Sequence, residues 1–325
     1  MRISAAAFAL AIALTLVACS SGESDDKKSA AIAEEPEAAG PRAAGGAEAK
    51  LVILGSGTPI PEPDRSGPAV AVVAGGRAYL VDFGPGVVRR AEAAFRKGVD
   101  ALDVRRIAIA FATHLHSDHT AGYADLILTP AVVGRHDTLR VFGPVGLRAM
   151  TLHLLAAYAA DLEARRATGD DMSGYEVEVA EIPTPAALVE VYRDDNVTVR
   201  AFAASHGADG GALGYRFDAG GRSFVVSGDT TPTQALLDAC AGCDVLLHEV
   251  YCERGLAEGP PSLQAYHRDH HTSAVQLGEL ASKAAPGLLA AYHVLGFGCT
   301  DAEIQAEIAS RYAGRTVITA DLDVL

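Results

Sequence analysis

The sequence has few basic residues for its number of acidic ones. Its 325 residues include 27 Lys and Arg against 41 Asp and Glu, so the formal net charge at pH 7 is −14 with His neutral. A protein that binds nucleic acid without sequence preference relies on Lys and Arg to neutralise phosphates. The charge balance therefore argues against a general nucleic-acid binder, although it leaves room for a local basic patch.

The N-terminal apolar segment is too short to span a membrane as a mature helix. A short positive region, Met1-Arg2, precedes an apolar stretch over residues 5–17, which ends in Leu16-Val-Ala-Cys19. This ending resembles a bacterial lipobox, so we expect residues 1–19 to be a lipoprotein signal peptide, cleaved before Cys19 and leaving lipid on it. A plain secretory signal is the alternative. Either kind of signal would direct export of the protein, and lipidation would hold it in the bacterial cell envelope, on the periplasmic side.

Residues 20–48 have few large apolar side chains. They consist mainly of Ala, Gly, Pro, Glu, Asp, Ser and Lys, a composition that cannot bury a hydrophobic core. We expect them to form a flexible tether, with the folded domain over residues 49–325. The expected membrane partner is thus reached through lipid on Cys19.

Cysteine is scarce, with five residues in the chain. The four besides Cys19 are Cys240, Cys243, Cys252 and Cys299. The pair in Cys240-Ala-Gly-Cys243 could form a disulfide, bind a metal or be there by chance. An exported protein can keep a disulfide, but the spacing fixes no pairing among the four. We assign none of them a catalytic role.

Four potential metal ligands lie within six residues directly after the apolar segment 107–112, which is typical of a buried strand. They are His114, His116, Asp118 and His119. If the chain stays extended, the first three share one side and His119 faces a neighbouring point, an arrangement that suits two adjacent cations. Imidazole and carboxylate groups without a thiolate suit Zn²⁺ or a related divalent ion. A solvated His-rich turn is the alternative, and the position after a buried strand favours the metal.

Strands and hairpins alternate with helices twice along the chain. Hairpins are expected around residues 74–76 and 218–221, and a continuous helix over about 145–164. The segment 253–266 is expected to be irregular because Pro260-Pro261 would interrupt a helix. This order predicts an α/β (α+β) fold in which two mixed β-sheets pack face to face with helices outside.

Further ligand-type residues fall at the ends of later strands. They are His206, Asp229, the pair His248-Glu249 and His293. Each alone is typical of a turn residue, but their order after the His stretch indicates a metal site. Asp82 also ends a strand, where it could cap the following loop or accept a hydrogen bond from a metal-bound histidine.

These residues resemble the metallo-β-lactamase superfamily, and specifically its ribonuclease Z and arylsulfatase-like branch. The resemblance covers nearly all of residues 50–320 and implies an αββα sandwich. It rests on Gly55-Ser-Gly-Thr-Pro59, Val81-Asp-Phe-Gly84, Thr113-His-Leu-His-Ser-Asp-His119, Ser205-His206, Ser227-Gly-Asp-Thr230, His271-Thr-Ser273 and Tyr292-His293.

The resemblance implies two Zn²⁺ ions, with Mn²⁺ or Fe²⁺ as alternatives. One ion would be held by His114, His116 and His206, and the other by Asp118, His119 and His293, with Asp229 bridging them. Asp at 229 differs from the Cys of true β-lactamases. His at 116 differs from the acidic residue of the di-iron flavoprotein relatives.

The implied activity is hydrolysis of phosphodiester or sulfate esters, with a metal-bridged hydroxide as the nucleophile. His271 matches the His-Ser/Thr motif of this branch, which implies a leaving-group acid or oxyanion stabiliser, and Glu249 would orient it. With the ligand Asp118, these are the expected catalytic residues. Alternatives are a lactone or β-lactam hydrolase, which would not need His271, and a non-catalytic metal-containing lipoprotein.

Two departures from ribonuclease Z bear on the substrate. We find no Gly/Pro- and Lys-rich arm of the kind that grips transfer RNA, and the early Arg-Asn pair appears as Arg65-Ser66. Together with the acidic charge and the expected export, these departures lead us to expect a small ester substrate and no nucleic acid. A homodimer is left open.

Overall fold

The computed structural model describes residues 49–207 and 211–325. The predicted signal peptide and tether fall outside these residues and stay predictions. Within the described part of the chain, no helix has both the length and the apolar character needed to cross a bilayer.

The N-terminal half forms a six-stranded sheet in the order β1-β2-β3-β4-β5-β6. Its strands are β1 (Lys50–Gly55), β2 (Ala69–Ala74), β3 (Arg77–Val81), β4 (Ile109–Phe111), β5 (Leu139–Pro144) and β6 (Val177–Ile182). The first three are antiparallel neighbours, whereas β3, β4, β5 and β6 run parallel. The carboxyl ends of the parallel strands therefore meet at one edge, where loops build sites.

The C-terminal half forms a seven-stranded sheet in the order β13-β12-β11-β10-β9-β8-β7. Its strands are β7 (Val189–Arg193), β8 (Val197–Ala203), β9 (Leu213–Ala219), β10 (Arg222–Val226), β11 (Val245–Tyr251), β12 (Leu288–Leu295) and β13 (Thr316–Ile318). Strands β10 to β13 are parallel and the others are antiparallel. Both sheets are therefore mixed, as the sequence predicts.

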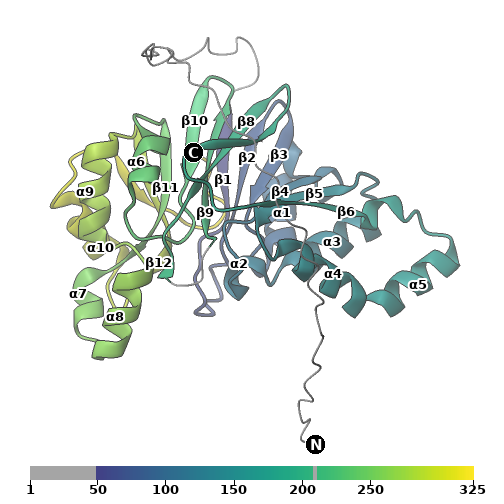
Figure 1. Cartoon of the computed structure of the whole chain (residues 1–325), viewed down its shortest axis with the longest axis horizontal. Helices are drawn as coiled ribbons and strands as arrows, with labels where there is room; N and C mark the ends of the chain where they lie inside the picture. The colour runs from purple at the N-terminus through teal and green to yellow at the C-terminus, as the bar shows by residue number, and fades with distance from the viewer. Residues whose placement is uncertain (1–48, 208–210) are drawn as a thin grey trace, which may run out of the picture. The chain divides into compact units, whose positions relative to one another are not determined.

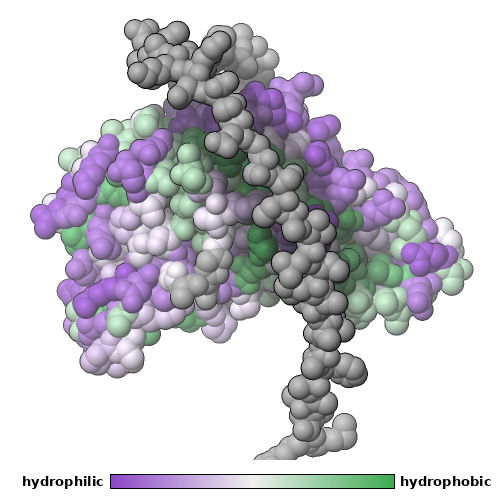
Figure 2. Space-filling model, viewed as in Figure 1, coloured by the Kyte–Doolittle hydropathy of each residue, from purple (hydrophilic) through white to green (hydrophobic). Residues whose placement is uncertain are grey.

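Helices cover the outer faces of both sheets (Figure 1). Beside the first sheet lie α1 (Val87–Arg96), α2 (Ser117–Thr120), α3 (Tyr123–Val132), α4 (Leu147–Ala157) and α5 (Ala159–Thr168). Beside the second lie α6 (Gln234–Cys240), α7 (Glu253–Ala257), α8 (Pro261–His270), α9 (Ala274–Ala284) and α10 (Asp301–Ala309). In Figure 2 the surface over α7 to α10 is mostly hydrophilic, and hydrophobic surface shows toward the middle of the view.

Three hydrophobic layers hold this arrangement together, one between the sheets and one under each set of helices. The layer between the sheets includes Phe111 of β4, whose ring lies 5.4 Å from that of Phe217 and 5.3 Å from that of Tyr215 in β9. Aromatic pairs at such distances stabilise a core beyond the area that they bury. The expected four-layer αββα sandwich is confirmed.

Two helical segments differ from expectation. The helix expected over 145–164 is divided at Tyr158 into α4 and α5. The expectation of an irregular segment over 253–266 is wrong, because α7 and α8 occupy it. Pro260 is the N-cap of α8 and Pro261 its first residue, positions where the missing N–H of proline costs no helical hydrogen bond.

Disulfides join Cys240 to Cys243 and Cys252 to Cys299. The first closes the turn after α6, and the second connects the start of α7 with the loop before α10. The metal-pair reading of Cys240 and Cys243 is therefore wrong. The structure supplies a pairing that the spacing left open.

Candidate metal centre

The predicted ligands lie at the carboxyl ends of strands from both sheets. His114 and His116 follow β4, His206 follows β8, Asp229 follows β10, and His293 lies near the end of β12. Every one of these side chains except His116 is buried. The structure thus brings together residues from across the folded chain at the edge where the two sheets meet.

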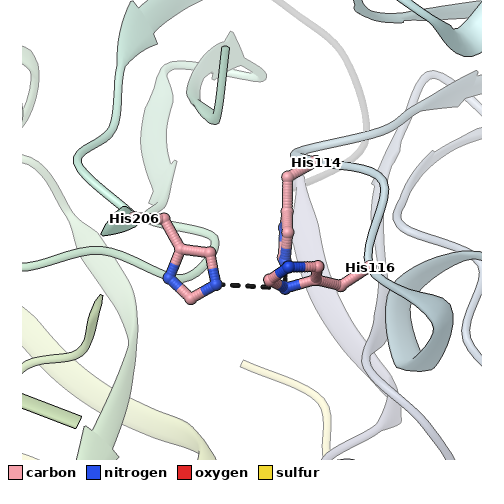
Figure 3. Close-up of side chains that lie close together, drawn as sticks. All are labelled: His114, His116 and His206. Carbon is pink, nitrogen blue, oxygen red and sulfur yellow. Dashed lines mark hydrogen bonds between the residues drawn. The ribbon is translucent and has the colours of Figure 1, made fainter. Parts of the chain in front are cut away.

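The first group consists of His114, His116 and His206 (Figure 3). Nε2 of His114 lies 3.0 Å from Nδ1 of His116, which lies 3.1 Å from Nε2 of His206. Nδ1 of His206 faces the carbonyl oxygen of His270 at 2.8 Å, which directs its Nε2 toward the other two rings. Three imidazole nitrogens therefore converge on one point, as a single cation requires.

The second group consists of Asp118, His119 and His293. Nε2 of His293 lies 3.2 Å from Oδ2 of Asp118, and Nε2 of His119 lies 3.5 Å from the same oxygen. The expectation that the chain stays extended through Asp118 is wrong. His116 is the N-cap of α2, so the helical turn moves Asp118 away from His114 and places it with His119.

Asp229 lies between the two groups. Its Oδ1 is 3.4 Å from Nε2 of His119, and its Oδ2 is 3.5 Å from Nε2 of His293. It also clusters with His114 on one side and with His206 and His271 on the other. A carboxylate in this position can reach both candidate sites.

Buried polar atoms test whether this pocket fits cations. Nε2 of His119 and Oδ1 of Asp229 are buried without a hydrogen-bond partner among the described residues. Unsatisfied polar atoms in a protein interior are costly unless something binds them. Because the donor set is imidazole and carboxylate with no thiolate, the residues fit divalent ions such as zinc.

Asp82 fixes the orientation of His119. Its Oδ2 accepts from Nδ1 of His119 at 2.8 Å and from the hydroxyl of Thr113 at 2.9 Å, while its Oδ1 accepts from the Thr113 N–H at 2.7 Å. Asp82 therefore accepts from the far nitrogen of the histidine, one of the two roles that the sequence left open. Its other contacts hold the loop after β4 and not the loop that follows Asp82 itself. With Nδ1 protonated toward Asp82, Nε2 keeps its lone pair for a cation.

A β-bulge directs His293 into the pocket. Tyr292 pairs with Glu249 and Val294 with Val250, so His293 is an extra residue in β12. It adopts φ 46°, and its N–H donates to the carbonyl of Ser56 at 3.1 Å. A bulge of this kind re-aims a side chain that would otherwise alternate along the strand.

Burial and neighbouring charges shift the pKa values of the pocket residues, often in opposite directions. Burial lowers the pKa of His114 well below its ordinary value. Burial also acts to lower the pKa of His119, but the carboxylates of Asp229 and Asp82 outweigh it and raise that pKa well above its ordinary value. Burial acts to raise the pKa of Asp229, yet His293 and His119 hold it well below its usual range. A cation entering the pocket must therefore displace a proton from His119.

His271 and Glu249 lie beside Asp229. Nδ1 of His271 is 3.3 Å from Oε1 of Glu249 and 3.9 Å from Oδ2 of Asp229. Oε1 of Glu249 also accepts the N–H groups of Thr272 at 3.0 Å and Thr230 at 3.3 Å. Burial lowers the pKa of His271 to about 4. Burial and the nearby Asp229 raise the pKa of Glu249 well above its ordinary value, which favours its neutral form.

Sequence reasoning missed the bracing of the Gly55–Gly57 turn. Oδ1 of Asp321 accepts from both the N–H and the hydroxyl of Ser56 at 2.8 Å, and Arg65 donates to the Ser56 hydroxyl at 3.1 Å. Because Ser56 in turn holds His293, these residues support the pocket indirectly. A single Asp near the C-terminus carries no local signal for such a role.

Comparisons with known proteins give consistent results. The model of the β-lactamase superfamily domain matches residues 77–294. The ribonuclease Z of Mycobacterium bovis is 32% identical over 284 residues, which cover 84% of this chain and 96% of the relative. Among solved structures, the metallo-β-lactamase fold protein YhfI of Bacillus subtilis superposes with a TM-score of 0.62 at 17% identity, over 85% of this chain and 99% of its own. The short form of human tRNase Z superposes with a TM-score of 0.61 at 19% identity, over 85% of this chain and 98% of its own.

The similarity to ribonuclease Z corrects one expectation. The expected partners, a small ester and no nucleic acid, are wrong, because the relatives that match almost end to end are ribonucleases. Net charge is a sum over the whole surface and does not report the field inside one site. The departures at Arg65-Ser66 and in the arm were therefore insufficient grounds for excluding RNA.

Proposed function

The chain belongs to the metallo-β-lactamase superfamily, in its ribonuclease Z-like branch, and is a metal-dependent hydrolase; from this premise we propose that it hydrolyses phosphodiester bonds in RNA. The observation that carries the proposal is the convergence of two ligand groups on Asp229, with His271 beside them. Two adjacent positive centres match a phosphodiester, whose charge builds on the phosphoryl oxygens during hydrolysis.

We propose that each ligand group holds one zinc ion, with Asp229 contributing to both. The first group is His114, His116 and His206, and the second is Asp118, His119 and His293. When bound, two such ions activate a water and neutralise the phosphoryl oxygens. The protein contributes the direction of the ligands, because the bulge in β12 positions His293 and the carboxylate of Asp82 accepts from Nδ1 of His119.

We propose that His271 protonates the leaving oxygen with the help of Glu249. A lone imidazole with a pKa of about 4 would be a poor proton store at pH 7. Burial and Asp229, however, raise the pKa of Glu249, which favours its protonated form, and its Oε1 lies 3.3 Å from Nδ1 of His271. If Nε2 gives its proton to the leaving oxygen, Nδ1 can take the proton of Glu249. The resulting carboxylate is then stabilised by the N–H groups of Thr230 and Thr272.

We keep the proposal, made from the N-terminal sequence, that the protein is located in the cell envelope. Cleavage before Cys19 and lipidation would place the domain in the cell envelope, so its RNA would be met outside the cytoplasm. Labelled palmitate should appear in the protein and be absent from a Cys19→Ser variant. Protein that stays in the cytoplasm with an intact N-terminus would refute this part of the proposal.

The test of the activity is cleavage of an end-labelled RNA hairpin with a single-stranded 3′ tail by the full chain with zinc restored. Asp118→Ala and His271→Ala should each lower the rate by ~100-fold or more, the range for loss of a metal ligand or a general acid. The matched control is His136→Ala, since His136 is a 71% exposed histidine that pairs with Asp171 and belongs to none of the ligand groups. Its rate should equal that of the parent.

Metal content separates the possible outcomes. His271→Ala should still bind two zinc ions per chain, because it removes no proposed ligand. RNA left intact by a parent protein that holds two zinc ions would refute the proposed substrate. Full activity in Asp118→Ala would refute the assignment of the second site.

A further inference from the structure

A second cavity lies at the opposite edge of the first sheet from the candidate metal centre. It has a volume of about 460 Å³ and is lined at the starts of β3, β4 and β5. Because these strands run parallel, their carboxyl ends lead to Asp82 and His114 while their amino ends face the cavity. At about 3.3 Å per residue, the five residues of β3 alone separate the cavity from the centre by about 15 Å.

Three arginines line this cavity in an otherwise acidic protein. They are Arg77, Arg106 and Arg140, and Asp137 is the one acidic residue of the lining. Their side chains come from separate segments, so the fold gathers three positive charges that the sequence scatters. A cavity with an excess of positive charge attracts anions.

The ion pairs that these arginines make with acidic side chains are long. Arg77 is 3.8 Å from Asp194 and Arg140 is 3.8 Å from Glu178. Arg106 has no ion pair with any residue that the structure describes, and it donates to the carbonyl of Gly76 at 3.2 Å.

Other arginines of the chain are paired more closely. Arg89 lies 2.8 Å from Asp125, and Arg200 lies 2.6 Å from Asp218. The three guanidinium groups of the cavity are thus less neutralised than these.

The neighbouring acid is already satisfied by other donors. Asp194 accepts the hydroxyl groups of Tyr79 at 2.8 Å and Tyr192 at 2.9 Å, together with the N–H groups of Asn196 at 2.9 Å and Val197 at 3.0 Å. Its charge is therefore stabilised without Arg77. The guanidinium of Arg77 can turn to a ligand without leaving a buried carboxylate unpaired.

Aromatic rings hold Arg140 in place. The carbon of its guanidinium lies 5.5 Å from the ring centre of Phe142 and 5.4 Å from that of Tyr192, within the range of cation–π contacts. A guanidinium held over two rings loses less conformational freedom when its N–H groups bind a ligand.

We propose that this cavity is a second, non-catalytic site for a phosphoryl group. Arginine forks bind phosphate through paired N–H donors, and the cavity volume lies in the range of small-ligand sites. The phosphate belongs either to a free nucleotide or to the backbone of RNA. The distance to the metal centre excludes the phosphodiester being cut, so the proposal stands whether or not RNA is the substrate.

The test is equilibrium binding of inorganic phosphate, adenosine monophosphate and a short single-stranded RNA to the full chain. Binding is measured after treatment with a chelator, and in Asp118→Ala, so that any phosphate held at the metal centre is removed from the signal. Saturable binding of at least one probe should persist under both conditions. It should weaken as salt rises, because charge drives it.

The variants are Arg106→Gln with Arg140→Gln, and separately Arg77→Gln. Each should weaken binding at least tenfold, whereas Arg89→Gln, an exposed arginine of α1, should leave it unchanged. Arg77 is 62% exposed, so its variant stays informative if the double variant folds poorly.

Two comparisons decide the result. Tighter binding of the nucleotide than of RNA identifies a free ligand, and the reverse identifies the RNA backbone. The proposal is overturned if no probe binds saturably after chelation, or if binding is the same in the arginine variants.

Discussion

Replacing Asp82 with Asn should weaken the second cation site without disturbing the fold. Asn has nearly the same volume and tolerates the φ of 60° at this position. Its carbonyl oxygen can still accept the N–H of Thr113, now at 2.7 Å from the carboxylate. Its amide nitrogen, however, would face Nδ1 of His119, where the carboxylate oxygen now lies at 2.8 Å. A donor there moves the imidazole proton to Nε2, the atom that faces Asp118 and Asp229.

The expected loss follows from this change of tautomer. Loss of the residue that orients a metal-bound histidine typically lowers metal affinity by about 10- to 100-fold. This corresponds to about 1.4–2.7 kcal/mol of binding free energy. The loss should fall mainly on one of the two ions, because Asp82 contacts His119 directly and is linked to His114 through the hydroxyl of Thr113.

Competition with a zinc chelator measures both binding steps in the parent and in Asp82→Asn. Thr113→Val is the comparison variant, because it removes the hydroxyl that contacts Asp82 and Nδ1 of His114 but leaves the His119 contact with Asp82 intact. The dissociation constant of the more weakly bound zinc ion should rise by at least tenfold more in Asp82→Asn than in Thr113→Val. Equal affinities in the parent and Asp82→Asn would refute the assignment of His119 Nε2 as a ligand atom.

Three further predictions concern the acid pair, a disulfide and a buried histidine. Glu249→Gln should slow hydrolysis by ~100-fold with zinc content unchanged, because His271 then loses its proton source 3.3 Å away; single-turnover rates and metal analysis measure this. Replacing Cys252 and Cys299 with Ala should lower the free energy of unfolding by about 4 kcal/mol, from the 47-residue separation of the pair, as measured by denaturant titration. The metal-free protein should lose stability as pH falls from 6.5 toward 4, because burial lowers the pKa of His248 to about 4 and the unfolded chain binds that proton first; melting temperatures across this range test it.

Each of these has its own control. Loss of zinc from Glu249→Gln would show a structural role in place of proton transfer. Replacing Cys240 and Cys243, which are three residues apart, should cost about 1.5 kcal/mol, and a larger cost than for the long loop would contradict the chain-entropy argument. His248→Gln should flatten the pH dependence of stability, and an unchanged slope would assign that dependence to other groups.

The sequence alone determined much of the architecture. Its alternation of strands and helices predicted the two mixed sheets, and the hairpins expected around residues 74–76 and 218–221 are present as β2 with β3 and β9 with β10. It also identified the side chains that the pocket brings together. Each potential ligand lies at the end of an apolar strand pattern, which can be recognised in the sequence without knowing how the strands pair. It failed at Pro260-Pro261, where the same residue that breaks a helix interior can begin a helix.

The family resemblance already implied how the ligands divide, and only the tertiary structure decided what positions and supports them. The helical turn of α2 separates Asp118 from His114, and the bulge in β12 turns His293 toward Asp118. The bulge depends on the pairing of β12 with β11, which no local pattern reports. The same holds for the disulfide of Cys252 with Cys299 and for the cavity that collects three arginines. A sequence shows which groups can bind or react, but packing sets the distances between them, and binding and catalysis depend on those distances.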